Sequence, residues 1–69
     1  MNPIKFLAIV EMKKVLYSCE DGDLARIAGV SERTFIGSRQ TPEEFTIEEI
    51  NHLIKFLKFT EEERKEALL

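Results

Sequence analysis

The sequence is poor in cysteine, proline and glycine, and it has no tryptophan. Among its 69 residues are one cysteine, two prolines and three glycines. The single Cys19 excludes an internal disulfide framework and is typical of a protein from a reducing cytoplasm. We interpret Cys19 as a small, partly buried residue near a helix end, because a redox or nucleophilic role would require a neighbouring histidine or acid.

Long apolar runs and strand patterns are also missing. No run of about 18 apolar residues is present, so the sequence predicts no membrane span. The first residues, MNPIKFLAIVEMKK, carry interleaved charges and no small-residue cleavage site, so they do not resemble a signal peptide. No alternating stretch is bounded by turn residues, which leaves little signal for strands. These absences predict an all-α, cytoplasmic protein.

What is present favours one compact domain spanning residues 1–69. The chain is 43% hydrophobic and contains five phenylalanines, which argues against disorder. Its net charge of −3 is unevenly distributed: residues 1–20 sum to +1, residues 21–41 to 0 and residues 42–69 to −4. A mildly acidic total lowers the expected non-specific affinity for DNA without excluding DNA binding.

The pattern predicts five short helices. The first begins after Asn2-Pro3, where proline is favoured, and ends by Ser18 or Cys19. The second runs from Gly22 to Ala28 with Asp21 as its cap, and the third from Glu32 to Arg39, followed by a loop over residues 40–44. Helical spacing in the first helix is followed by Phe6, Ile9, Val10, Lys13, Leu16 and Tyr17.

The last two helices have the clearest starts. Thr46 and Thr60 each open a T-x-x-E capping box, and Phe45 and Ile50 are placed for a hydrophobic staple at the first of them. The fourth helix is expected to turn one apolar stripe inward. The members of that stripe are Ile47, Ile50, Leu53, Ile54 and Leu57.

The segment Leu24 to Phe35, LARIAGVSERTF, carries the most specific signal. Two helical patterns meet at Gly29-Val30-Ser31, with the spacing of a helix-turn-helix. Gly29 can adopt the positive φ that ends a helix, and Ser31 can cap the next one. Leu24, Ala25, Ala28 and Phe35 are expected to pack inward, with Val30 filling the corner.

With these helices placed, residues 20–60 resemble the lambda-repressor-like helix-turn-helix family, which includes the small Cro proteins. The resemblance is closest to short phage- and prophage-type regulators. The residues that carry it are Leu24-Ala25, the run GVSERTF from Gly29 to Phe35, the run PEEFT from Pro42 to Thr46, and Glu49-Ile50. It implies that the third helix enters the major groove of an operator, while the second crosses the DNA backbone.

The resemblance places six residues toward the bases: Ser31, Glu32, Arg33, Ile36, Gly37 and Gln40. Arg33 can donate twice to guanine, or else pair with an acid such as Glu32 or Asp23. Glu32 could accept from cytosine or cap the third helix. Ile36 could touch a thymine methyl group or join the core, and Gln40 could bind adenine or belong to the loop.

Seven further residues are expected near phosphates: Lys13, Lys14, Arg26, Thr34, Ser38, Arg39 and Thr41. The family commonly binds as a homodimer, with two recognition helices one DNA turn apart. The apolar end Ala67-Leu68-Leu69 is either a core tail or a dimer contact.

Nothing in the sequence predicts an enzyme, a cofactor or a metal. His52 has no second ligand at metal spacing, and the pairs Glu43-Glu44 and Glu48-Glu49 are explained by helix caps and dipoles. Two functions remain. The first is a sequence-specific regulator of transcription that binds double-stranded DNA. The second is a helix-turn-helix module that binds a protein, which the acidic C-terminal half and the weak Ile36-Gly37-Ser38 end of the third helix favour.

Overall fold

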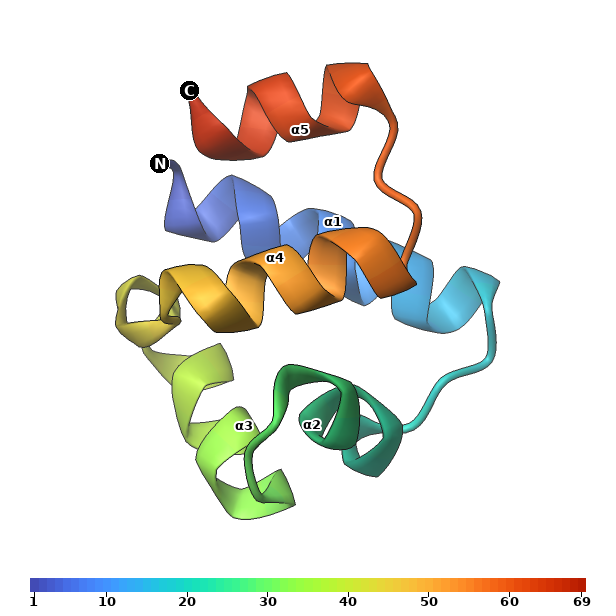
Figure 1. Ribbon diagram of the computed structural model, residues 1–69, viewed down its shortest axis with the longest axis vertical. Coiled ribbons are helices and arrows are strands. Elements are labelled where there is room, and N and C mark those ends of the chain that lie inside the picture. Colours follow the sequence, from blue (N-terminus) through green and yellow to red (C-terminus); the bar gives the residue numbers. More distant parts are fainter.

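The computed structural model describes all 69 residues and consists of five α-helices and one short 3-10 helix, as Figure 1 shows. There are no strands, so the prediction of an all-α protein with five helices is confirmed. The chain is compact, with a radius of gyration of 10.7 Å. The elements are α1 (Pro3–Leu16), α2 (Asp21–Ala28), α3 (Glu32–Gln40), η1 (Pro42–Glu44), α4 (Ile47–Phe56) and α5 (Glu61–Leu68).

The helices are arranged with α5 at one end of the molecule and the α2–α3 pair at the other (Figure 1). Between them α4 crosses the molecule in front of α1. α2 packs against both α3 and α4, α1 packs against α5, and η1 contacts α1 and α3. None of these helices combines the length and apolarity needed to cross a membrane.

Local capping explains where α4 and α5 begin. The Thr46 amide donates to Glu49 at 2.7 Å and the Glu49 amide donates to the Thr46 hydroxyl at 3.1 Å. Thr60 and Glu63 make the same two bonds at 2.8 and 3.1 Å. Both predicted capping boxes are therefore confirmed.

Two predicted boundaries differ by one residue. α2 begins at Asp21 and not at Gly22, so Asp21 is not its cap. The cap is Glu20, whose amide donates to the Asp23 carboxylate at 3.0 Å, and this leaves the Asp21 side chain free for other partners. At the other boundary α3 includes Gln40, and the expected loop contains η1.

The core is built around phenylalanine. Phe45 lies between two other rings, with its centroid 5.5 Å from that of Phe6 and 6.0 Å from that of Phe35. The Phe59 ring also contacts Phe6, with the two centroids 5.8 Å apart. These four rings connect α1, α3 and the segments on both sides of α4, so they fix the corner formed by α2 and α3 to the rest of the molecule.

Three apolar residues lie outside this core despite their helical spacing. Ile47 was expected on the inward stripe of α4, but its side chain is 78% exposed. Side chains lean toward the N-terminus of their helix, so this first residue of α4 reaches past the helix start, where no core residue covers it. Leu16 and Tyr17, at the end of α1, are exposed as well.

Candidate nucleic-acid interface

The corner between α2 and α3 is fixed by backbone conformation and capping. Gly29 has φ +84°, in the left-handed region, and the Val30 amide donates to the Ala25 carbonyl at 3.0 Å. The Ser31 hydroxyl accepts from the Thr34 amide at 3.1 Å and so begins α3. The positive φ of Gly29 and the Ser31 cap were predicted from the sequence and are confirmed. They set the direction of α3 relative to α2.

α3 has one buried and one exposed face. Phe35 is fully buried and Ser38 nearly so. The six residues expected to face bases are all exposed: Ser31, Glu32, Arg33, Ile36, Gly37 and Gln40. Two of them, Ile36 and Gln40, line a hollow of about 400 Å³ together with Arg39 and with Leu7 and Glu11 of α1. Gly37 faces open space.

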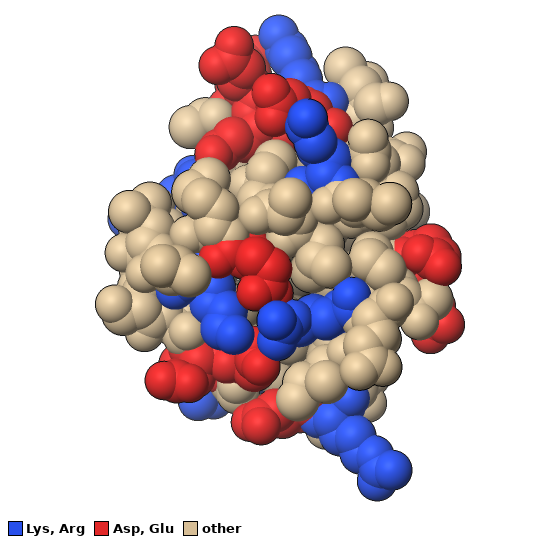
Figure 2. Space-filling view, turned by 180° about the vertical axis from the view of Figure 1, so that it is seen from behind, with Lys and Arg blue, Asp and Glu red and all other residues tan.

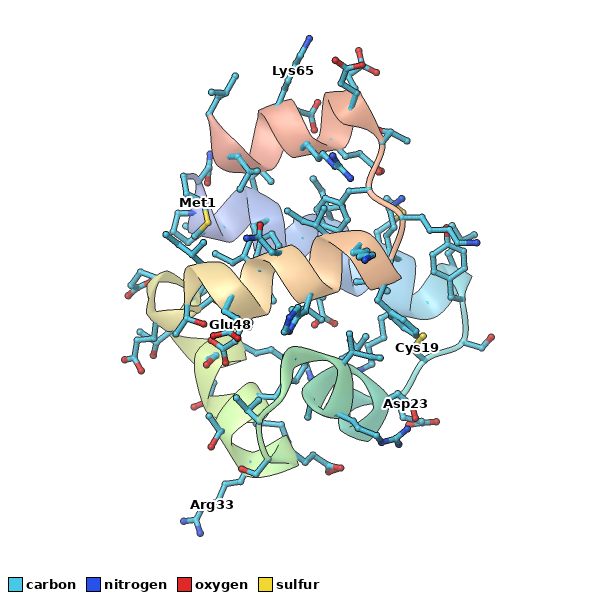
Figure 3. All side chains as sticks on the ribbon, in the orientation of Figure 1. Met1, Cys19, Asp23, Arg33, Glu48 and Lys65 are labelled. Atoms are coloured by element: carbon cyan, nitrogen blue, oxygen red, sulfur yellow. The ribbon has the colours of Figure 1, made fainter.

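Arg33 is the most prominent side chain of this face. Figure 3 shows it extending from the first turn of α3 away from the body of the molecule. The acid that could have paired with it, Asp23, instead contacts Arg26 at 3.1 Å. The Arg33 guanidinium is therefore available for a ligand.

Glu32 lies against the start of α2. Its Oε1 atom is 2.8 Å from the position that a Cβ on Gly22 would occupy. A carboxylate at this place is favoured by the positive end of the α2 dipole. Neither of the two sequence interpretations of Glu32 included this position of its side chain beside Gly22.

Four charged residues form an ion-pair cluster that joins α1, α2 and α3. Arg39 contacts Glu11 through Nε at 2.8 Å and Asp21 through Nη1 at 2.7 Å. The Lys14 ammonium lies 2.6 Å from the other Asp21 oxygen. Figure 2 shows such red and blue side chains meeting in the middle of the rear face. Two of the cations expected at phosphates are therefore already paired within the chain.

The cluster keeps Asp21 ionised. The Lys14 ammonium, with a further contribution from the Arg39 guanidinium, holds the pKa of Asp21 below its ordinary value, although partial burial acts in the opposite direction. At neutral pH the carboxylate is therefore charged and holds both cations.

Two other expected phosphate ligands are withdrawn by burial. Lys13 is nearly fully buried. Its ammonium lies 2.7 Å from Glu63 and donates to the Lys58 carbonyl at 3.1 Å. Ser38 lies on the buried face of α3 and is nearly fully buried as well. We remove both from the candidate interface. Arg26 and Thr34 are exposed and Thr41 is half-buried, so they remain.

Sequence reasoning missed the acids of this site. Glu11 and Asp21 precede Arg39 by 28 and 18 positions, so no helical spacing connects them to it. Only the packing of α1, α2 and α3 brings the three residues together. Cys19, by contrast, is half-buried just past the end of α1, as its interpretation predicted.

Comparisons of the chain with models of protein families, with curated proteins and with solved structures gave no match.

Proposed function

We propose that this protein is a sequence-specific regulator of transcription that binds double-stranded DNA. In this proposal α2 and α3 form a helix-turn-helix of the lambda-repressor-like type, and α3 enters the major groove. One observation carries the proposal. Phe35 is fully buried and anchors α3 in the core, while all six candidate base-reading residues are exposed.

The dimensions of α3 suit this role. Its nine residues form a rod about 14 Å long, and the major groove, about 12 Å wide, admits an α-helix. A recognition helix contacts base edges mainly with residues near its N-terminus. Arg33 stands in that first turn and can offer two donors to guanine O6 and N7.

Contacts to the DNA backbone would be few. Arg26 is exposed beside Asp23, and Thr34 and Thr41 can donate from their hydroxyls. Lys14 reaches a phosphate only after leaving Asp21, and Arg39 only after leaving both Asp21 and Glu11. We therefore expect modest affinity per chain, a shallow dependence on salt, and binding of a palindromic operator by two chains, without a cofactor.

Selection of bound sequences from a pool of random duplexes tests the proposal. The chain should enrich a defined sequence, and a scrambled duplex of equal length should bind more weakly at every salt concentration. The Arg64→Ala variant, which removes an exposed arginine of α5, should select the same sequence. Absence of any enriched sequence, together with no duplex binding at low salt, would refute the proposal.

A second candidate is a module that uses the same frame to bind a protein. The specific observation in its favour is the ion-pair cluster, which neutralises Lys14 and Arg39 beside α3 in a chain of net charge −3. This function predicts that α3 variants lose a protein partner while duplex DNA is not bound at low salt. The selection experiment therefore separates the two functions.

A further inference from the structure

α1 carries an apolar surface on both of its sides. Phe6, Ile9 and Val10 face the core. On the opposite side a second row of apolar side chains faces outward, and we call it the α1 band: Ile4, Ala8, Met12, Val15 and Leu16. Ile4 is 76% and Val15 79% exposed. A helix that is apolar all round is normally buried, so this band lacks a covering partner.

The band occupies a defined place between two helices. On one side of it, Leu7 and Glu11 of α1 line a hollow together with α3. On the other side, Lys13 binds Glu63 of α5. Figure 2 shows the corresponding tan surface between the charged side chains of α5 and the ion-pair cluster. Neither α3 nor α5 covers it.

We infer that the α1 band is the contact surface for a second copy of this chain, with the two α1 helices packed antiparallel about a twofold axis. α1 has 14 residues and is about 21 Å long. Packing two such bands together buries on the order of 1,000 Å² in total, the lower limit for a specific interface. The dimer is therefore expected to be weak and dependent on concentration.

The charges of α1 favour the antiparallel orientation of the two copies. Glu11, Lys13 and Lys14 are paired within the chain, which leaves Lys5 as the one charged side chain of α1 without such a partner. In the antiparallel arrangement the two Lys5 side chains stand about 13 Å apart along the axis, beyond the Debye length of about 8 Å. A parallel pair would place them side by side.

The side chains of the band match one another when the two antiparallel helices are aligned with Ile4 of one copy opposite Val15 of the other. This pairing occurs at both ends of the contact. The small Ala8 lies near the middle, where it lets the helices approach closely. A twofold interface requires such a match of a surface with itself.

The arrangement has a consequence for α3. The twofold axis is perpendicular to the plane of the two α1 helices. Rotation about it leaves a residue that lies above this plane in one copy above the plane in the other copy. Because α3 adjoins the Glu11 flank in each copy, both α3 helices lie on the same side of the dimer. One duplex could therefore meet both. The dimer itself does not rest on the proposed function, since it forms without DNA.

Sedimentation equilibrium of the whole chain, without DNA, tests the inference. The mass should rise above 8.0 kDa toward twice that value as concentration increases. Val15→Glu should weaken association at least about tenfold, because it buries two charges in the contact. Ile47→Glu, at an equally exposed apolar residue of α4, should associate as the unmodified chain does. Circular dichroism checks that both variants are folded.

A monomeric mass at every concentration would overturn the inference, and so would equal weakening by both variants. Binding of lipid vesicles by a monomer, lost in Val15→Glu, would assign the band to a membrane instead. Orientation is tested by mixing Ile4→Cys and Val15→Cys chains, both carrying Cys19→Ser, under mild oxidation. The antiparallel dimer predicts mostly mixed disulfides between the two chains. Disulfides mostly within each kind of chain would refute that orientation.

Discussion

The ammonium nitrogen of Lys13 lies 2.7 Å from a carboxylate oxygen of Glu63 and joins α1 to α5. Lys13 also donates to the Lys58 carbonyl at 3.1 Å and lies 5.6 Å from the centre of the Phe59 ring. Glu63 in turn accepts from the Thr60 amide, so one carboxylate both begins α5 and fastens it to α1. The buried Lys13 thereby holds α5 and the segment before it against α1.

Glu63→Gln should therefore destabilise the protein at neutral pH by about 1–3 kcal/mol, because Lys13 remains buried without a counter-charge. The Lys13 ammonium and the Thr60 amide hold the pKa of Glu63 below its ordinary value of 4.5. A lowered folded-state pKa means that this stability is complete above pH 4.5 and is lost as the pH falls through the folded-state pKa. Urea unfolding at pH 7 and at pH 3 measures both effects.

The matched control for this prediction is Glu62→Gln, an exposed neighbour in the same helical turn. It should change stability by less than about 0.5 kcal/mol at either pH. The difference between Glu63→Gln and the unmodified protein should shrink at pH 3. A difference that stays constant between pH 7 and pH 3 would show that the ion pair contributes nothing through its charge.

The elements that could be predicted from sequence are those fixed by neighbours in the chain. Thr46 and Thr60 act on amides three residues away, and Gly29 determines its own backbone conformation. Phe35 was expected in the core because it follows the Ser31 cap by four residues, and it is fully buried. Each of these signals acts within one helical turn.

Features that depend on distant packing could not be predicted. Ile47 fits the apolar stripe of α4 by spacing, but nothing in the sequence shows that no other element covers the start of that helix. Arg39 and Lys13 were expected at phosphates because they are cationic. Their acidic partners come from other helices, and only the assembled fold places them within 4 Å.

The two exposed glycines of the α2–α3 region should respond to alanine in opposite directions. Gly37 lies within α3 and a Cβ there would meet open space, so Gly37→Ala should stabilise the protein by about 0.5–1 kcal/mol. Gly29 has φ +84°, so Gly29→Ala should destabilise it by about 1–2 kcal/mol. Thermal unfolding of the pair measures both. Destabilisation by Gly37→Ala would indicate that α3 needs its glycine for a conformation other than this one.

Removal of the Arg33 side chain should affect DNA binding and not stability. Arg33 is exposed and takes part in no hydrogen bond within the chain, so Arg33→Ala should change the unfolding free energy by less than about 0.5 kcal/mol. Binding of the selected duplex should weaken by about 1–3 kcal/mol, with relaxed preference at one base pair. Arg64→Ala on α5 is the control. An equal loss for both variants would mean that arginine charge alone, and not base contact, supports binding.

Release of the ion-pair cluster should strengthen DNA binding at a cost in stability. Asp21→Asn removes the carboxylate that holds Lys14 and one of the two carboxylates that hold Arg39, which keeps Glu11, so the protein should lose about 1 kcal/mol of stability at neutral pH. With Arg26 as the exposed cation expected at a phosphate near α3, the slope of log K against log salt should be about −1 per chain before the substitution. It should steepen by about one unit afterwards, as the freed Lys14 ammonium reaches a phosphate. Glu66→Gln, on α5, changes the net charge equally and should leave the slope unchanged. A slope that stays the same in Asp21→Asn would show that Lys14 does not contact the DNA backbone.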